Sequence, residues 1–287
     1  MKIKIIGACT DLGVEKNGAD KGPRAIISEL NTNDVVFIDK PYCVKSTDPN
    51  DLKKNLNEVN FFNTNLYNEV KKAIEDGKFP ITIGGDHSMA IGSALASKSI
   101  NNNLGIIWID AHLDYNTFKT TITGNLHGLP LAAINGLAKD LTPFSNNFIN
   151  SKNTVVVGYR SMEKNKEEEL SNAKGAGISV FDSQYINKYG IEDAMKRAID
   201  IASKNTDGLH ISFDLDVIDA IFAPGVSVPE PDGINLDTAY KIVDIIVSHI
   251  DKIKSFDLVE YNPTYDKDSK TKEIALTILD KVMNSIK

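Results

Sequence analysis

Cysteine is scarce in this chain, which has only Cys9 and Cys43 among its 287 residues. Two cysteines in a chain of this length do not make a disulfide framework. Long apolar runs are also missing, since no stretch approaches the roughly 18 apolar residues of a membrane-spanning helix. The first residues, Met1–Gly7, read as a strand and lack the apolar core of a signal peptide. We therefore expect a cytoplasmic protein that does not enter a membrane.

Basic residues are too few to balance the acidic ones, and the formal net charge is −7. This deficit argues against nucleic acid as a main partner. The 41% of apolar and 25% of charged residues are those of an ordinary soluble globular protein. The sequence contains no Pro-, Gly- or Ser-rich linker, no low-complexity tract and no internal repeat. We expect one domain that covers residues 1–287.

What the sequence does contain is a regular alternation of two patterns. Short apolar runs read as strands, and they occur at Ile3–Ile6, Val35–Ile38, Phe79–Ile83, Leu104–Ile109, Thr154–Val157, Gly177–Phe181, Leu209–Phe213 and Ile253–Leu258. Helix-like segments separate most of them, at Gly22–Glu29, Leu52–Asp76, Met89–Ala96, Glu163–Lys174, Ile191–Asn205, Asn235–His249 and Lys270–Ile286. Strands that alternate with helices predict an α/β fold of three layers, in which a mostly parallel sheet of roughly eight strands is covered on both faces.

Three short polar motifs each follow one of these apolar runs, and together they hold six candidate metal ligands. The candidates are His87, Asp110, His112, Asp114, Asp214 and Asp216. Alternate side chains of an extended segment point to the same side, so ligands spaced by two residues can converge on one point. In an open parallel sheet, ligands bind beyond the carboxyl ends of the strands. We therefore expect the motifs to meet at that edge of the sheet.

Two imidazoles and four carboxylates form a ligand set for two divalent cations. Such a set favours manganese, although cobalt, nickel or iron would also be accepted. Two ions about 3.5–4 Å apart share a water and lower its pKa, so that hydroxide forms near neutral pH. Each motif alone is compatible with a strand-end cap or a turn, but all three together are hard to explain structurally. The set predicts a metal hydrolase in which hydroxide attacks carbon or phosphorus.

Further motifs add to these three, and the whole chain then resembles the ureohydrolases, a family that includes arginase, agmatinase and formimidoylglutamase. The resemblance rests on Asp11–Gly13, Gly18–Pro23, Gly84–Ser88, Asp110–Asn116, Gly124–Pro130, Gly158–Arg160, Ser212–Asp216, Glu260–Pro263 and Thr271. It implies an arginase-like fold and a small guanidino or amidino substrate. It also implies a homo-oligomer, as a trimer or a hexamer.

The resemblance also implies a role for each matching residue. One manganese ion would be held by His87, Asp110, Asp114 and Asp214, and the other by His112, Asp110, Asp214 and Asp216. Asp114 would take part in proton transfer, Glu260 would pair with the substrate guanidinium, and His127 would shuttle protons. The amino-acid carboxylate would contact Asn116 and the segment that includes Thr123 and Asn125.

The substrate is where the motifs disagree. Glu163 stands near the place where arginases carry an Asp pair that helps to bind the substrate amino group. The segment Ala223–Gly233 looks more like formimidoylglutamases, whereas Thr123–Gly128 looks like arginase in particular. We expect hydrolysis of L-arginine to L-ornithine and urea, with formimidoylglutamate and agmatine as the alternative substrates. A two-metal phosphoesterase and a non-catalytic relative are more remote alternatives.

Overall fold

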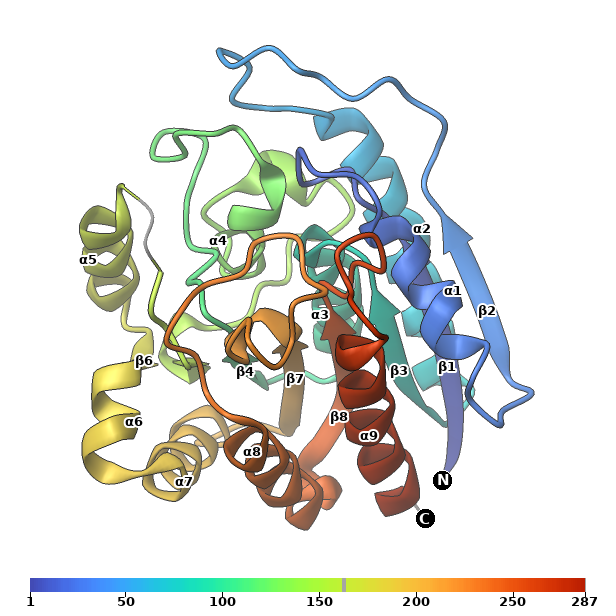
Figure 1. Cartoon of the computed structure of the whole chain (residues 1–287), viewed down its shortest axis with the longest axis vertical. Coiled ribbons are helices and arrows are strands. Elements are labelled where there is room, and N and C mark those ends of the chain that lie inside the picture. The colour runs from blue at the N-terminus through green and yellow to red at the C-terminus, as the bar shows by residue number, and fades with distance from the viewer. Residues whose placement is uncertain (162–163, 287) are drawn as a thin grey trace.

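An eight-stranded parallel sheet forms the centre of the computed structural model, which describes residues 1–161 and 164–286 (Figure 1). The strands are β1 (Lys2–Cys9), β2 (Val35–Asp39), β3 (Lys78–Gly84), β4 (Leu104–Ile109), β5 (Thr154–Val157), β6 (Ser179–Phe181), β7 (Gly208–Asp214) and β8 (Ile253–Val259). Their order across the sheet is β2-β1-β3-β8-β7-β4-β5-β6, and every neighbouring pair is parallel. The eight strands that the sequence predicts are confirmed.

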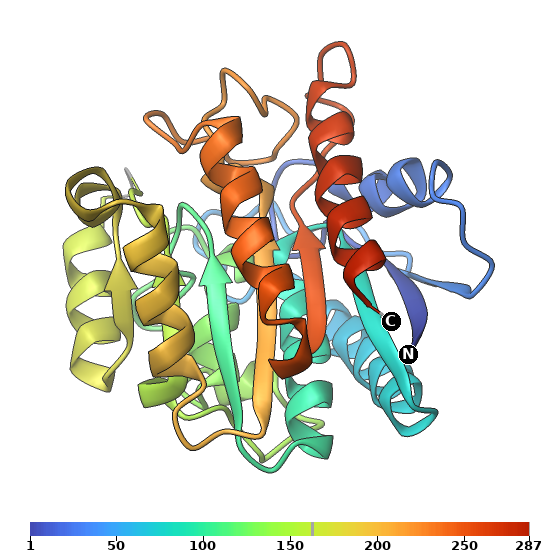
Figure 2. The ribbon, with the colours of Figure 1, turned by 90° about the horizontal axis from the view of Figure 1, so that it is seen from below.

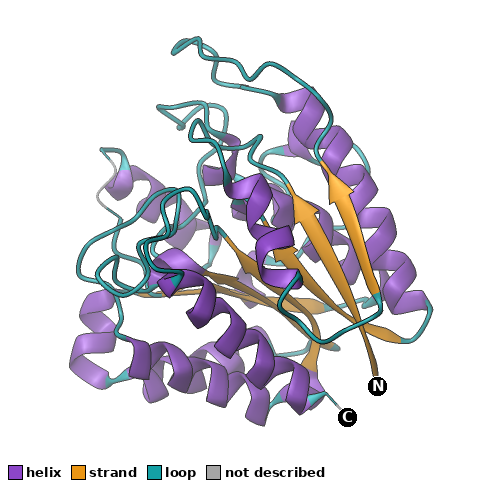
Figure 3. Cartoon of the chain, turned by 45° about the vertical axis from the view of Figure 1, so that its right-hand side comes forward, coloured by secondary structure: helices purple, strands orange, loops and turns teal. Residues whose placement is uncertain are grey.

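Helices cover both faces of this sheet, as Figures 2 and 3 show. One hydrophobic cluster holds residues of α1 (Gly22–Ile27), α6 (Ser183–Tyr189), α7 (Ile191–Ala202), α8 (Leu236–Ser248) and α9 (Lys270–Ser285). The other holds residues of α2 (Leu56–Glu75), α3 (Ala90–Ile100), α4 (Pro130–Ile134) and α5 (Lys166–Ala176). The predicted three-layer α/β architecture is therefore confirmed.

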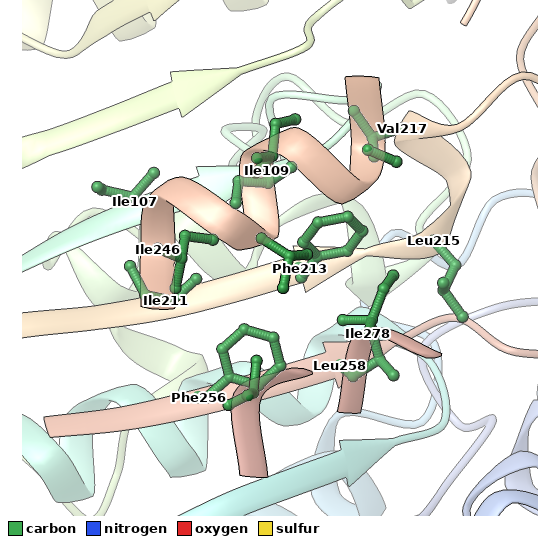
Figure 4. Close-up of a cluster of buried hydrophobic side chains, with 14 of the residues drawn as sticks. Ile107, Ile109, Ile211, Phe213, Leu215, Val217, Ile246, Phe256, Leu258 and Ile278 are labelled. Carbon is green, nitrogen blue, oxygen red and sulfur yellow. The ribbon is translucent and has the colours of Figure 1, made fainter. Parts of the chain in front are cut away.

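The central strands β3, β8, β7 and β4 are buried along nearly their whole length, and most of their residues are apolar, because both faces of the sheet are covered. Every residue of β4 is buried, and the alternation of its side chains divides them between the two clusters. Ile107 and Ile109 point to the same side as Ile211 and Phe213 of β7, where α8 and α9 add further side chains (Figure 4). Trp108 points to the opposite side, into the cluster that holds residues of α2 to α5.

The longest helix, α2, shows how the outer layers are held. Its buried apolar residues recur every three or four positions, at Val59, Phe62, Leu66 and Val70, and so form one face toward the sheet. The opposite face carries charged residues. Among the described residues, none of the helices is long and apolar enough to cross a membrane.

Some predicted boundaries were wrong, and the backbone explains why. The helix predicted from Leu52 begins at Leu56, because Asn55 has a left-handed conformation (φ 56°) that a helix cannot continue through. The strand predicted from Gly177 begins at Ser179, because Gly177 (φ 99°) caps α5. The short helices α4 and α6 were not predicted, although Pro130 and the capping side chain of Asp182 mark their first turns.

Candidate metal centre

Four adjacent strands at the middle of the sheet, β3, β8, β7 and β4, carry the candidate site at their carboxyl ends. The side chains concerned are His87 after β3, Glu260 after β8, Asp214 and Asp216 at and after β7, and Asp110, His112 and Asp114 after β4. Residues as far apart in sequence as His87 and Glu260 are therefore neighbours in space. This is the edge at which the sequence predicts the site to lie.

The turn after β3 depends on Gly85. A Cβ atom at this position would lie 1.8 Å from the backbone oxygen of Thr10, so no larger residue fits. The following residue, Asp86, accepts hydrogen bonds from the backbone N–H groups of Ser88 and Gly13, both at 3.0 Å. These bonds hold the short helical turn His87–Met89 and fix the direction in which His87 enters the site.

The first group of candidate ligands surrounds His87. Its Nδ1 lies 3.1 Å from Asp110 Oδ2, 3.2 Å from Asp114 Oδ2 and 3.0 Å from Asp214 Oδ2. Its other ring nitrogen, Nε2, lies 2.8 Å from Ser212 Oγ, and the ring stacks on Trp108 with the centroids 3.8 Å apart. The imidazole is thus held from two sides, with Nδ1 directed at three carboxylates.

The second group surrounds His112. Its Nδ1 lies 3.0 Å from Asp216 Oδ2 and 3.4 Å from Asp110 Oδ1. Asp110 therefore turns one oxygen toward each histidine, as a bridging carboxylate would. His87, Asp110 and Asp214 offer ligand atoms within 4.8 Å of one another, and so do Asp110, His112 and Asp216. The structure thus brings the six predicted ligands together, while a bridging role for Asp214 stays a prediction.

The ligands converge through another geometry than their spacing predicts. A spacing of two residues predicts extended segments, but Asp110 and His112 lie in a bend and Asp114 has a left-handed backbone (φ 51°). Asp216 lies in a helical turn, Leu215–Val217, where its N–H donates to Asp214 Oδ1 at 2.8 Å. Turns rather than alternation along a strand aim these ligands, and the strained conformation of Asp114 fits a functional position.

Crowding of carboxylates sets the electrostatics of the site. Burial and the negative charge of Asp110 raise the pKa of Asp114 to about 7. Burial, with the charges of Asp216 and Asp110, also raises the pKa of Asp214 well above its usual range. Burial would raise the pKa of Asp110 too, but the neighbouring imidazoles of His112 and His87 lower it. Negative charge gathered in this way favours a bound cation.

A divalent cation fits these residues. Nδ1 of His87 is buried and has no hydrogen-bond partner in the part of the chain that the structure describes, although three carboxylates surround it. A nitrogen lone pair directed at the cation would account for this orphaned atom. The donors are imidazole nitrogen and carboxylate oxygen, which suit manganese and its neighbours in the first transition row.

Beside the two groups lies a buried pair, Glu260 and His127. Glu260 Oε1 accepts a hydrogen bond from the backbone N–H of His87 at 2.8 Å and lies 3.2 Å from His127 Nδ1. Its other oxygen, Oε2, is buried and has no partner within residues 1–161 and 164–286. Burial would lower the pKa of His127, but the hydrogen bond and charge of Glu260 raise it to about 9. Glu260 also has a left-handed backbone (φ 68°).

The loop that follows β4 holds the predicted contacts for an amino-acid carboxylate. Asn116 is buried, and its Oδ1 accepts hydrogen bonds from Thr120 Oγ1 at 3.0 Å and from Asn165 Nδ2 at 2.7 Å. Those two bonds leave the Nδ2 group of Asn116 as a donor that no described residue uses. Thr123 is exposed, and its Oγ1 accepts from the N–H of Asn125 at 3.2 Å.

Glu163, also predicted as a substrate contact, lies outside the described residues.

Two residues that contact the candidate ligands, Ser212 and Glu230, were not predicted as site residues. Ser212, inside one of the motifs, contacts Nε2 of His87. Glu230 lies 3.3 Å from Nε2 of His112, and it belongs to the segment Ala223–Gly233 that was considered only for its family likeness. The sequence did contain a hint, because Glu230 lies between Pro229 and Pro231. Two prolines restrict the backbone and so hold this carboxylate in one place.

Comparison with known proteins supplies independent findings. A model of the arginase family matches residues 1–284. An arginase of Staphylococcus aureus (strain COL) is 35% identical over 293 residues, which cover 96% of this chain and 95% of the relative. The crystal structure of an Entamoeba histolytica arginase in complex with L-ornithine aligns with a TM-score of 0.90 at 27% identity and covers 98% of both chains. A formimidoylglutamase of Bacillus subtilis aligns with a TM-score of 0.80 at 20% identity over 100% of this chain and 88% of the other, a likeness in fold alone.

Proposed function

The chain belongs to the arginase family and is a hydrolase of C–N bonds in linear amidines, and we propose that its substrate is L-arginine, which it converts to L-ornithine and urea. The observation that carries the proposal is the buried carboxylate of Glu260. It lies beside two groups of candidate metal ligands, and no described residue pairs with its Oε2. A buried carboxylate with an unused oxygen calls for a cationic donor, and a guanidinium is a planar cation with several N–H donors.

Each of the two groups of candidate ligands would hold one metal ion. His87, Asp110, Asp114 and Asp214 would hold one ion, and His112, Asp110 and Asp216 the other, with Asp214 as a second bridge. Two divalent cations bound here would supply hydroxide near neutral pH and polarise the group that it attacks. The residues of the chain then have three tasks, which are to orient the guanidinium, to move protons and to select the rest of the substrate.

Orientation falls to Glu260. Its Oε1 is already committed to the N–H of His87 and to His127, so the guanidinium would donate to Oε2. The bond to the backbone of His87 ties the position of this carboxylate to that of the metal ligands. The amidino carbon would in this way be presented beside the ions.

Proton transfer falls to His127 and Asp114. With a pKa of about 9, His127 is protonated at neutral pH and carries a proton that it can deliver to the departing amine. Its Nδ1 faces Glu260, and its Nε2 donates to no described residue. Asp114, which is directed into the first group of ligands, would pass a proton from the attacking water toward the same nitrogen.

Selection between arginine and agmatine falls to the α-carboxylate. The Oδ1 atom of Asn116 is occupied by Thr120 and Asn165, and these bonds direct its Nδ2 donor outward. An anionic acceptor suits this donor, and arginine has an α-carboxylate whereas agmatine has none. The curated arginases that match this chain do so over nearly its full length, which supports the same choice.

A substrate panel tests the proposal. The manganese-loaded protein is incubated with L-arginine, agmatine and N-formimidoyl-L-glutamate, while urea and formamide are assayed. We expect urea from L-arginine and little product from the other two. Formamide from formimidoylglutamate alone would refute the proposal and would make the Ala223–Gly233 segment the better guide.

The variant Asn116→Ala sharpens this test. It should lower kcat/KM for L-arginine by roughly 10- to 100-fold, as expected for the loss of a hydrogen bond to a charged group. Its kcat/KM for agmatine should stay unchanged, because agmatine has no carboxylate to contact. Equal losses on both substrates would contradict the role of Asn116 in carboxylate recognition.

Three further properties complete the proposal. The native metal is manganese, with two ions per chain, because four carboxylates and two imidazoles suit it. The chain assembles into a trimer or a hexamer in the cytoplasm, as the family resemblance implies. Metal analysis of protein purified without added metal, and light scattering of the same sample, test the first two directly.

A further inference from the structure

The two histidines of the metal centre have different partners on their outer nitrogens. Nε2 of His87 lies 2.8 Å from the neutral hydroxyl of Ser212. Nε2 of His112 lies 3.3 Å from the carboxylate of Glu230, which is itself 94% buried. A carboxylate therefore lies behind one candidate metal ligand and a hydroxyl behind the other.

Glu230 is held in place by its surroundings. Pro229 and Pro231 flank it, and the ring of a proline fixes its own φ near −65°. Arg160 reaches across from the end of β5 and donates to the backbone oxygens of Glu230 at 3.1 Å and of Pro231 at 2.9 Å. A third donor bond from Arg160 goes to the backbone oxygen of Asp216 at 2.7 Å.

Arg160 therefore ties the segment that carries Glu230 to the turn that carries Asp216. Asp216 and His112 belong to the same group of candidate ligands, since their ligand atoms lie 3.0 Å apart. Near its far end the segment is fixed again, because the N–H of Gly233 donates to Asp219 Oδ2 at 2.9 Å. The carboxylate of Glu230 is thus placed behind His112 by bonds that do not involve His112 itself.

We propose that Glu230 is a positioning residue that strengthens metal binding at the His112 site and not at the His87 site. When the Nε2–H of His112 donates to Glu230, the proton stays on Nε2, so Nδ1 keeps its lone pair and points toward Asp110 and Asp216. A carboxylate partner also makes the imidazole a better donor to a cation. The inference rests on the two-metal centre of the proposed function.

Metal binding is the measurement that tests this role, because it needs no substrate. Manganese affinities are measured by equilibrium dialysis against a competing chelator for the wild type, Glu230→Ala and Glu230→Gln. Loss of such an outer partner lowers metal affinity by roughly 10- to 100-fold. We expect this loss for one of the two ions in Glu230→Ala. A smaller loss is expected in Glu230→Gln, since the amide oxygen still accepts from Nε2–H.

Two controls separate positioning from a general structural effect. Asp232→Asn removes a charge from an exposed residue of the same segment and should change neither affinity. Glu230→Gln should still fold and melt cooperatively in a chelator, because the proposed role acts through the bound ion. A variant that is unfolded without metal would show that Glu230 supports the fold instead, which would overturn the proposal.

Assignment to one site comes from a double variant. Asp216→Ala removes a ligand from the His112 site alone, and the ion that remains then reports the His87 site. Adding Glu230→Gln to this background should leave the affinity for the remaining ion unchanged. A lower affinity for the remaining ion in the double variant would overturn the proposal. Two unchanged affinities in the single variant Glu230→Ala would also overturn it. A wild type that binds fewer than two ions would instead refute the two-metal centre itself.

Discussion

Replacing Glu260 by glutamine is the sharpest test of how the substrate is held. The change keeps the shape of the side chain and one oxygen, which can still accept the N–H of His87 at the position of Oε1. It puts an NH2 group in place of Oε2, the buried atom that has no partner among the described residues. A guanidinium donor would then meet another donor at a buried position.

The size of the effect follows from the burial of this group, since Glu260 is 2% exposed. A hydrogen bond to a charged group contributes about 1.5–3 kcal/mol, and removing one partner of a buried ion pair costs about 3–5 kcal/mol. Because about 1.4 kcal/mol corresponds to a factor of ten, kcat/KM for L-arginine should fall by roughly 10²- to 10⁴-fold. Metal content should not change, because Glu260 contacts the backbone of His87 and not its ring.

The assay is urea release at saturating manganese, together with metal analysis of the same preparations. Glu75→Gln is the matched control, since Glu75 is an exposed residue at the end of α2, paired only loosely with Lys71 at 3.9 Å. It should leave both readings unchanged. A kcat/KM within threefold of wild type in Glu260→Gln would refute the guanidinium contact. A loss of metal in that variant would show that Glu260 supports the ligand cage instead.

Three further perturbations have defined outcomes. Asp216→Ala should leave partial metal content with a large loss of turnover, as metal analysis and urea assays would show, and full activity would contradict a centre of two ions. His127→Asn should slow catalysis by about 10²-fold or more at unchanged metal content, and equal rates would exclude it as the proton shuttle. The pKa of His127 is raised to about 9, so its pair with Glu260 stabilises the metal-free fold fully below about pH 6.5. This stabilisation is lost as the pH rises to about 9. The difference in melting temperature between the wild type and His127→Asn should therefore shrink over that interval. Gly85→Ala should lower the free energy of unfolding by about 1–3 kcal/mol, whereas Gly175→Ala, where the new Cβ meets nothing within 4 Å, should not destabilise, and urea denaturation measures both.

Local chemistry was readable in the sequence. The strands of the sheet appear as apolar runs because a strand buried on both faces has mostly apolar residues on both of its sides. The six candidate ligands were found because the residue types that bind divalent cations stood directly after those runs. Their common location was also predictable, since all strands of a parallel sheet end at the same edge. These inferences use only neighbours in the chain.

Backbone conformation limited the accuracy of these inferences. The apolar periodicity alone predicts that the helix begins at Leu52, but the left-handed backbone of Asn55 delays its start to Leu56. The periodicity of apolar residues does not reveal such a backbone conformation. The ligands after β4 and β7 were expected on extended segments, but bends and a helical turn aim them. The spacing of two residues predicted correctly that these ligands converge, but the predicted extended backbone was wrong. A turn can also bring alternate residues to one side.

Contacts between distant segments were decided by the tertiary structure alone. Glu260 and His87 are 173 positions apart, and they meet because the sheet places β8 directly beside β3. Glu230 contacts His112 because Arg160 binds the loop of Glu230 to the turn that follows β7. The sequence by itself determined which elements form and which residues can bind metal, since both depend on local periodicity and side-chain chemistry. The order of the strands and the path of the loops decided which of those residues share a site, because such pairings depend on packing between parts of the chain that no local pattern connects.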